Sequence, residues 1–480
     1  MTTETVSDRS SAREAPAPPW GLALTAIVGA EFMLQLDGTI VNVALPTLQH
    51  DLGISVNTGT WVPNAFFLAF GGLLLFAGRL GDVLGHRRVF VSGIALVVVA
   101  SLLAGLAPDL PVLLVGRILQ GAGAAVAGPT GLALLTIVFE GERRQRAFGL
   151  YSTVTGLGAS AGMILGGLLT WVGDWRWSLL VNVPVGIAVI VVAVRALGLD
   201  RGTTRTRSLA LPSAVLVTAA MTATVYGIVH ASGRGGWGSV GTWAPLAAAV
   251  VLWVLLALVD GRAGEPLLPR QVFASRERAG AFVNLLILAA VLTSFLIYLV
   301  QYLQGVLHFN ALESGLAILP FGAALLVTTQ LLTRHLGRFG LKSRAVAGLV
   351  VVLAGVGWLT QLNGGSSYLT GVLPQIVLIG VGVGVAIIPF NMIILTTAPA
   401  EYAGVTAGVL QTALTIGGSL GLAVLLIPLT SGTGGLAAHI STVFEWTSGL
   451  TVLAILAALG FWAGTGGGSD AEPGVAEAQG

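Results

Sequence analysis

The chain has 480 residues, of which 55% are apolar and only 9% are charged, and its mean hydropathy is +0.90. This composition leaves too little polar surface to cover a water-soluble globule, so an integral membrane protein is expected. Because one span needs ~20 apolar residues, the length accommodates about fourteen spans with short loops. The absence of cysteine excludes disulfides, thiolate catalysis and cysteine metal sites. The net charge of +2 by itself indicates little.

Apolar runs between clusters of charge, Gly and Pro predict fourteen membrane-spanning helices. In chain order they are 21–45, 58–80, 88–107, 110–138, 147–172, 177–199, 208–231, 242–260, 279–305, 313–336, 345–362, 370–397, 403–428 and 445–464. Two carboxylates in the first helix, and its length, argue against a cleaved signal peptide. Residues 1–19 and 466–480 lack apolar content and are expected to be disordered and cytoplasmic.

The distribution of basic residues supports an even number of spans. Arginine and lysine cluster after the second, fourth, sixth, eighth and tenth predicted helices, so that 20 of the 23 basic residues fall on one face of the membrane. By the positive-inside rule, both termini are cytoplasmic. The expected location is the cell membrane, with multiple passes.

The two halves of the chain show a weak internal repeat. Residues 80–85 are echoed by 336–340, and Gly121, Gly123 and Pro129 are echoed by Gly382, Gly384 and Pro389. The repeat predicts an N-terminal six-helix bundle at 20–200, a two-helix insertion at 201–270 and a C-terminal six-helix bundle at 271–465. Parallel halves around a central cavity are a transporter plan, although Gly-rich spans can also match by chance.

Three ionisable residues lie deep inside predicted spans, namely Glu31, Asp37 and Arg117. Each costs at least ~2.5 kcal/mol at a span centre, which makes it a functional candidate. Asp37 lies ~12 Å below the outer end of its helix and Arg117 ~9 Å below the outer end of its own, so the two share a depth. A proton-coupling pair and a purely structural ion pair both fit this arrangement.

Glu31 lies near the midplane, where no basic residue is predicted at its level. A lone carboxylate in a low dielectric holds a proton tightly, which suits a proton carrier or a site for cationic substrates. Gln35, Gly38 and Asn42 continue the same helical stripe as a polar track. The alternative for Glu31 is a protonated, hydrogen-bonded residue without a transport role.

Other polar residues within spans are candidate substrate contacts, although polar side chains often only hold helices together. They are Asn64, Tyr298, Gln301, Tyr302, Asn391, Gln411 and Thr415. All six histidines fall in loops or at span ends, so no metal site and no cofactor are expected. In the fifth predicted helix, Gly158, Gly162, Gly166 and Gly167 form a small-residue face for close helix packing, either sliding or static.

Four segments carry a resemblance to a known family. The loop Gly78-Arg79-Leu80-Gly81-Asp82-Val83-Leu84-Gly85-His86-Arg87-Arg88 resembles the signature loop of the major facilitator superfamily. Residues 36–46, residues 117–123, and Trp175-Arg176-Trp177 with Asn182-Val183-Pro184 resemble the fourteen-helix drug:proton antiporter family within it. The likeness covers almost the whole chain.

The resemblance implies an all-α membrane protein with the major facilitator fold, consisting of two six-helix bundles plus two inserted helices. It also implies that Asp37 belongs to a proton-coupling motif and that Arg117 is its basic partner. Gly78, Asp82, Gly85, Arg87 and Arg88 would belong to a conformational latch. Two departures weaken the likeness: Val83 and His86 stand where the family usually has basic residues, and Met163 replaces a proline of the antiporter motif.

The sequence therefore predicts a proton-coupled antiporter, not an enzyme, that exports amphipathic drug-like compounds, including cationic ones, by alternating access. Its partners would be a small-molecule substrate, protons and the lipid bilayer, without nucleic acid, and it would act as a monomer. Export of a lipid or lipid-linked molecule, and proton-coupled uptake, are alternatives with the same fold.

Overall fold

The computed structural model describes residues 20–198, 211–232, 236–263, 266, 268–332, 339–399, 402–430 and 435–463. All secondary structure in these residues is helical. The predicted disordered ends, and residues 336–338 of the repeated loop, lie outside the described residues.

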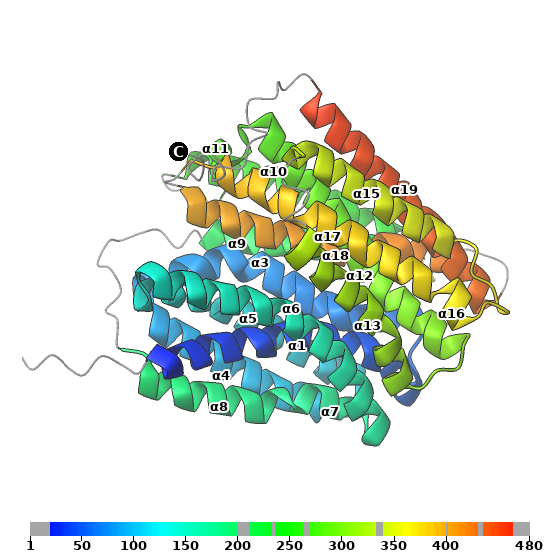
Figure 1. The fold of residues 1–480 in the computed structure, drawn as a ribbon, viewed down its shortest axis with the longest axis horizontal. Coiled ribbons are helices and arrows are strands. Elements are labelled where there is room, and N and C mark those ends of the chain that lie inside the picture. Colours follow the sequence, from blue (N-terminus) through cyan, green and yellow to red (C-terminus); the bar gives the residue numbers. More distant parts are fainter. Residues whose placement is uncertain are drawn as a thin grey trace, which may run out of the picture.

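The helices run in chain order in two halves with a helical pair between them (Figure 1). The first half contains α1 (Trp20–Asp51), α2 (Val56–Gly59), α3 (Trp61–Leu84), α4 (His86–Gly105), α5 (Leu110–Val138), α6 (Gly141–Val172), α7 (Trp175–Leu180) and α8 (Asn182–Ala196). The connecting segment contains α9 (Leu211–Ser232), α10 (Val240–Arg262) and the single turn α11 (Arg270–Phe273). The second half contains α12 (Arg276–Gly305), α13 (Ala311–Val327) with the π turn η1 (Thr328–Leu332), α15 (Leu341–Leu359), α16 (Tyr368–Gly371), α17 (Leu373–Thr396), α18 (Ala403–Thr430) and α19 (Leu436–Trp462).

Within the described residues, twelve helices are long and apolar enough to cross a membrane. The predicted spans 58–80 and 147–172 correspond to α3 and α6, helices of 24 and 32 residues that are not among those twelve. Several observed helix boundaries differ from the expected ones. The last helix begins at Leu436 rather than at 445, because its polar first turns, which include His439, continue the backbone hydrogen-bond ladder. The sixth predicted span, 177–199, corresponds to α7 and α8, which are separated only by Val181 and together form one candidate span at Trp175–Ala196.

The two halves pack their helices in the same way. Gly93 of α4 faces the Gly123 carbonyl of α5, and Gly348 of α15 faces the Gly382 carbonyl of α17 in the equivalent position. Gly121 lies against the Phe66 carbonyl of α3, as Gly380 lies against the Phe321 carbonyl of α13. Gly121 and Gly123 therefore correspond to Gly380 and Gly382, two residues before the glycines that the sequence comparison paired. Glycine at 380, 382 and 384 left that register ambiguous in the sequence alone.

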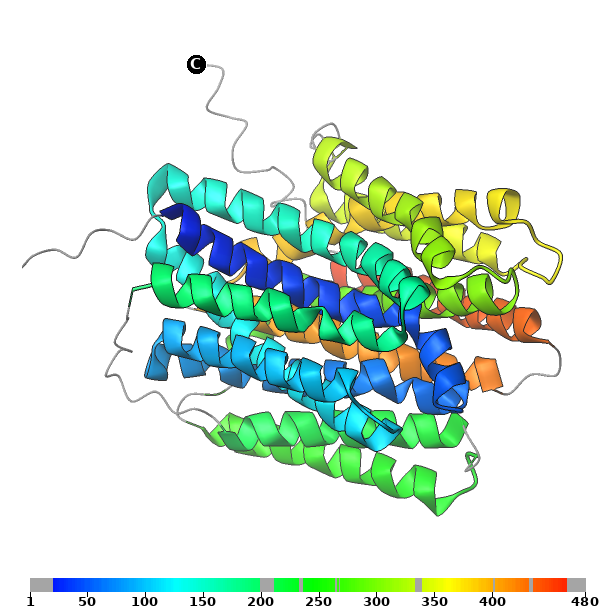
Figure 2. The ribbon, with the colours of Figure 1, turned by 90° about the horizontal axis from the view of Figure 1, so that it is seen from below.

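Helices α9 and α10 pair with each other along one side of the molecule (Figure 2). Of the two, α9 makes the extensive contacts with both halves, through α3 and α18. Gly72 of α3 approaches Thr218 of α9, a contact that leaves no room for a larger residue.

Contacts between the halves gather toward the end of the bundle that carries α7 and α16. Gly167 of α6 lies against the Ala311 backbone of α13, and Gln304 of α12 donates to the Val43 carbonyl of α1 at 3.0 Å. Ser419 of α18 donates to Asn64 of α3 at 2.8 Å. This end of the molecule is therefore closed by direct contact between the two halves.

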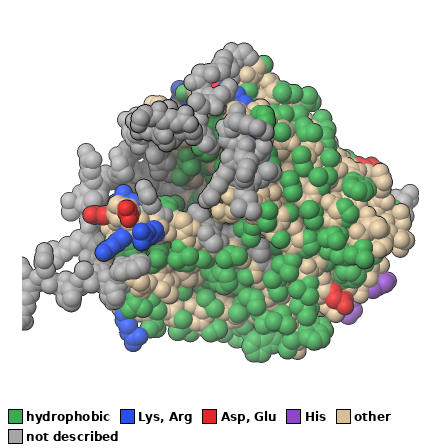
Figure 3. Space-filling view, viewed as in Figure 1, with side chains coloured by type: hydrophobic (Ala, Val, Ile, Leu, Met, Phe, Trp, Pro, Cys, Tyr) green, Lys and Arg blue, Asp and Glu red, His purple; other side chains and the backbone are tan. Residues whose placement is uncertain are grey.

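The outer surface suits a bilayer. On the face shown in Figure 3, apolar side chains cover the middle of the molecule, and basic side chains gather at one end. On α10, Val250, Val254 and Leu258 are each about half exposed, which is costly in water but favourable against acyl chains.

Candidate functional site

A buried ion pair joins the first and fourth predicted spans. The Asp37 carboxylate on α1 accepts a hydrogen bond from Arg117 Nη1 on α5 at 3.1 Å, and both side chains are 1% exposed. The two residues that the sequence placed at the same depth thus lie side by side. Removing water from both charges is costly, and their mutual attraction offsets part of that cost.

Two amides complete the shell of donors around Asp37. Oδ1 accepts from Gln120 Nε2 at 3.0 Å and from Asn182 Nδ2 at 2.5 Å, while Arg117 donates to Oδ2. Gln120 lies one turn after Arg117 on α5, and Asn182 is the first residue of α8. Three helices therefore converge on one carboxylate, which accepts hydrogen bonds from three side chains.

The guanidinium of Arg117 has several further contacts besides Asp37. It also donates to Gln120 Oε1 at 3.1 Å and, through Nε, to the Val62 carbonyl at 3.3 Å. Its carbon Cζ lies 4.5 Å from the centre of the Phe66 ring, a cation–π contact. Gln120 in turn donates to Ser101 Oγ on α4 at 2.8 Å. The position of Arg117 is thus fixed by α3 as well as by α1.

Glu31 occupies a different environment one and a half turns away. Its carboxylate accepts from Gln35 at 2.8 Å, from Thr155 at 3.0 Å and from the Tyr151 hydroxyl at 2.6 Å. Tyr151 and Thr155 lie one turn apart on α6, so this cluster joins α1 to α6. Among the described residues no basic side chain forms an ion pair with Glu31, which is only 6% exposed. Three neutral donors solvate Glu31, whereas Asp37 has a cation.

The predicted substrate contacts separate into satisfied and unsatisfied groups. The hydroxyls of Tyr298 and Tyr302, both fully buried, donate to the backbone carbonyls of Leu422 and Asn363. These hydroxyls are therefore already occupied. Thr415, which donates to the Gln411 carbonyl on its own helix, is satisfied in the same way.

Three other predicted contacts have buried polar atoms without a hydrogen-bond partner. They are Nδ2 of Asn64, both polar atoms of Gln301 and Oδ1 of Asn391. A buried amide without a partner costs free energy, so these atoms are the ones that a bound polar group would satisfy. Gln301 lies one turn before Gln304, which reaches α1, so it faces the same side of α12. Asn42 is 6% exposed on α1.

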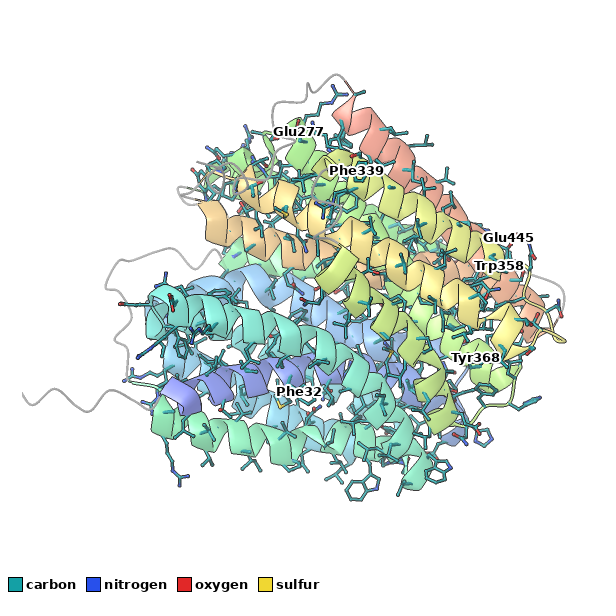
Figure 4. All side chains as sticks on the ribbon, viewed as in Figure 1. Phe32, Glu277, Phe339, Trp358, Tyr368 and Glu445 are labelled. Carbon is teal, nitrogen blue, oxygen red and sulfur yellow. The ribbon has the colours of Figure 1, made fainter. Side chains whose placement is uncertain are left out.

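A cavity of about 320 Å³ lies on the flank of α1. Its walls are apolar and come from α1, α6 and α8, including Leu24, Val28, Phe32, Leu150 and Val185. Figure 4 shows Phe32 on α1, and Figure 2 shows α1 between α6 and α8 on this side. Phe32 and Leu150, which line this cavity, are the chain neighbours of Glu31 and Tyr151.

The predicted latch lies at the junction of α3 and α4. Gly85 has φ +92°, a conformation that disfavours any residue with a side chain, and it ends α3 and begins α4 in one step. Arg87 donates to the Val194 carbonyl of α8 at 2.6 Å, within the same half, and Arg88 is exposed. Gly78 and Asp82 belong to α3, but the surroundings of their side chains lie outside what the structure describes.

The predicted small-residue face of α6 lies against two helices. Gly158, Gly162 and Gly166 approach α1 so closely that an added Cβ at Gly166 would lie 2.5 Å from the Ile40 carbonyl. Gly167 faces α13 of the other half, where an added Cβ would lie 2.4 Å from the Ala311 carbonyl oxygen. Met163, where the resemblance implies proline, continues α6 without a break and packs against Gly315.

The far end of α1 is anchored by the Trp175-Arg176 pair. Arg176 donates to Asp51 at 3.0 Å and to Asp174 at 2.8 Å, and Trp175 Nε1 donates to Asp51 at 2.9 Å. The guanidinium also lies over the Trp175 ring. This cluster fastens α1 to α7 and so supports the position of Asn182 immediately beyond α7.

Sequence reasoning missed the polar partners of both carboxylates. Gln120 and Asn182 fell within the quoted motif segments but received no role, and Tyr151 and Thr155 received no attention. The available signal was modest: Gln120 follows Arg117 by one turn, and Tyr151 and Thr155 share a helical face. Which of these polar residues meets which carboxylate depends on packing between helices.

A helical bundle of many spans, with a buried ion pair between helices and direct contact between the halves at one end, is typical of a membrane transporter. Comparison with known proteins identifies its family. The model of the Major Facilitator Superfamily matches residues 27–422, and the chain belongs to that family. Its members transport small molecules across membranes and are not enzymes.

Several curated relatives cover most of the chain. Puromycin resistance protein pur8 of Streptomyces alboniger is 39% identical over 90% of this chain and 86% of its own length. Cephamycin export protein CmcT of Amycolatopsis lactamdurans is 36% identical over 88% of each chain. The tetracenomycin C resistance and export protein of Streptomyces glaucescens is 34% identical over 90% of this chain and 81% of its own.

Solved structures support the fold. The peptide transporter POT superposes with a TM-score of 0.67 at 14% identity, over 92% of this chain and 94% of that one. The nucleoside transporter NupG gives 0.66 at 11% identity, over 92% of this chain and all of that one. At such low identities the likeness concerns the fold alone.

Proposed function

We propose that this protein is a proton-coupled antiporter that exports amphipathic, drug-like organic compounds by alternating access. Resistance and export proteins among its relatives, each covered over more than four fifths of its length, support drug efflux. The observation that carries proton coupling is the buried Asp37 with its cation and two amides, since a buried carboxylate whose partners can change is able to take up and release a proton.

The same proposal assigns a topology. Adding α3 and α6, which are long enough to cross a bilayer, to the twelve apolar helices gives fourteen spans, with both termini cytoplasmic. The domains would be bundles at 20–200 and 271–465 with an insertion at 201–270. The closed α7 and α16 end would then face outward.

Substrate recognition is assigned to the space between the halves. Glu31 and Gln35 would attract a cationic group, and the unpaired amide atoms of Asn64, Gln301 and Asn391 would bind neutral polar groups. The loop with Asp82, Gly85 and Arg87 would act as the conformational latch. Apolar parts of the compound need no specific partner.

The test uses purified protein in proteoliposomes loaded with a fluorescent cationic dye. An inwardly directed proton gradient should drive dye export by wild type, and Asp37→Asn should abolish the driven flux while leaving dye exchange without a gradient. The Asn side chain keeps the shape but cannot exchange a proton. Driven flux at the wild-type rate in Asp37→Asn would remove Asp37 from the mechanism.

A lipid exporter is the second candidate, because the apolar cavity beside α1 opens between α1, α6 and α8 at the level of the bilayer. An exporter of this kind would move a fluorescent phospholipid between leaflets of the same vesicles. Dye export without lipid movement would decide for drug efflux.

A further inference from the structure

The amide of Asn182 is a buried group with only one of its two ends occupied. Nδ2 donates to Asp37, whereas Oδ1 is buried without a hydrogen-bond partner, and the whole side chain is fully buried. A buried carbonyl oxygen without a donor is costly, and native structures contain few of them. Its position next to a titratable carboxylate therefore calls for an explanation.

The hydrogen-bonding inventory of a carboxyl group supplies one. An ionised carboxylate only accepts hydrogen bonds, and all three neighbours of Asp37 donate to it. A protonated carboxyl group must in addition donate one hydrogen bond. Protonation of Asp37 therefore requires that one neighbour change from donor to acceptor.

Only one of the three neighbours can make that change without breaking other bonds. Arg117 has no acceptor atom. Gln120 is engaged at both ends, because its Oε1 accepts from Arg117 and its Nε2 also donates to Ser101. Asn182 can rotate its amide by half a turn and present the unoccupied Oδ1 to the new hydroxyl.

Among the described residues, no charged or titratable group other than Arg117 contacts Asp37 through a hydrogen bond or ion pair. On α7, Arg176 bonds to Asp51 and Asp174, and on α6, Tyr151 bonds to Glu31. Arg117 on α5 is the charged group in contact with Asp37. When Asp37 binds a proton, the side chains that can rearrange in response are therefore its three hydrogen-bond donors, Arg117, Gln120 and Asn182.

We propose that Asn182 is a positioning residue that turns its amide when Asp37 binds a proton, and that it hydrogen-bonds to both forms of the carboxyl group. This step rests on the proposed function, in which Asp37 is the proton carrier. Because Asn182 is the first residue of α8, rotation of its amide changes the contact between α1 and α8 at the junction of α7 and α8. Gln120 is by contrast a fixed donor that favours the ionised form.

The two roles predict different titrations. Gln120→Leu removes a donor that serves mainly the carboxylate, so the midpoint of Asp37 protonation should rise by about one to two pH units, the equivalent of a hydrogen bond to a charged group. Asn182→Leu removes a donor from the ionised form and an acceptor from the protonated form. The two losses oppose each other, so the midpoint of Asp37 protonation in Asn182→Leu should shift by less than half as much as in Gln120→Leu.

The experiment is an infrared pH titration of the full-length protein in lipid nanodiscs, with the protonated Asp37 band identified by its absence in Asp37→Asn. In Asn182→Leu the carboxyl C=O band should also shift to higher frequency, because the protonated group has lost its acceptor. Asn182→Ala provides a second variant should the leucine variant fold poorly, as judged by size-exclusion elution.

The outcomes separate the two proposals. Equal upward midpoint shifts in Asn182→Leu and Gln120→Leu, with an unmoved band, would make Asn182 a plain donor and overturn the inference. Absence of any Asp37 band over the accessible pH range in wild type would instead refute proton carriage by Asp37, and with it the proposed function.

Discussion

Replacing Arg117 by alanine tests the electrostatic design of the buried pair directly. The substitution removes the one charged partner of Asp37, together with the contacts to Val62, Gln120 and Phe66. The carboxylate keeps two amide donors but remains almost completely buried. Breaking a buried pair by removing one partner costs about 3–5 kcal/mol if the other charge persists.

Asp37 can avoid this cost by binding a proton. At about 1.4 kcal/mol per pH unit, the lost stabilisation raises the midpoint of its protonation by about two to four pH units. The variant should therefore transport with a pH optimum shifted upward and a lower maximal rate, while substrate binding stays measurable. Its unfolding temperature in detergent should fall below that of wild type at high pH and recover as the pH is lowered, because protonated Asp37 needs no cation.

Efflux in proteoliposomes and thermal unfolding, each measured from pH 5 to pH 9, check both statements. Arg117→Lys should recover only part of the wild-type profile, since an ammonium cannot reproduce the planar fork of donors. Arg117→Ala combined with Asp37→Asn serves as the control and should lose the pH dependence of stability. An unchanged pH profile in correctly inserted Arg117→Ala would show that the two residues are not electrostatically coupled and would leave Arg117 a packing role.

Three further predictions follow from individual contacts. Glu31→Gln should weaken the binding of cationic dyes at least tenfold and the binding of neutral dyes little, whereas Tyr151→Phe should weaken the binding of both less. Equal losses for both dye classes in a binding titration would argue against charge recognition by Glu31. Gly166→Ala should lower the unfolding temperature, since the new Cβ would lie 2.5 Å from the Ile40 carbonyl. Gly149→Ala, which has open space at the new Cβ, should be neutral or raise stability by up to ~1 kcal/mol. Similar melting of both variants would contradict the close packing of α1 and α6. Gln301→Leu should stabilise the substrate-free protein, because it removes two unpaired polar atoms, and should reduce the affinity for polar substrates. A destabilised variant with unchanged affinity would show that Gln301 has a structural partner.

The buried pair illustrates how far the sequence alone leads. Hydropathy identifies the spans, and a rise of 1.5 Å per residue places Asp37 and Arg117 at one depth, because depth in a membrane depends only on position along a helix. The charged loop motifs likewise identified the superfamily. The family match over residues 27–422 bears out the recognition.

What the sequence could not supply is the direction in which each side chain points and the neighbour it meets. Tyr151 on α6 meets Glu31 because Gly158, Gly162 and Gly166 let α6 approach α1, and Asn182 reaches Asp37 because the start of α8 packs against α1. Such contacts join residues more than a hundred positions apart, so no local pattern encodes them. The tertiary structure decided them, because the polar groups of a span have no water to bind and are satisfied only by the helices packed beside them.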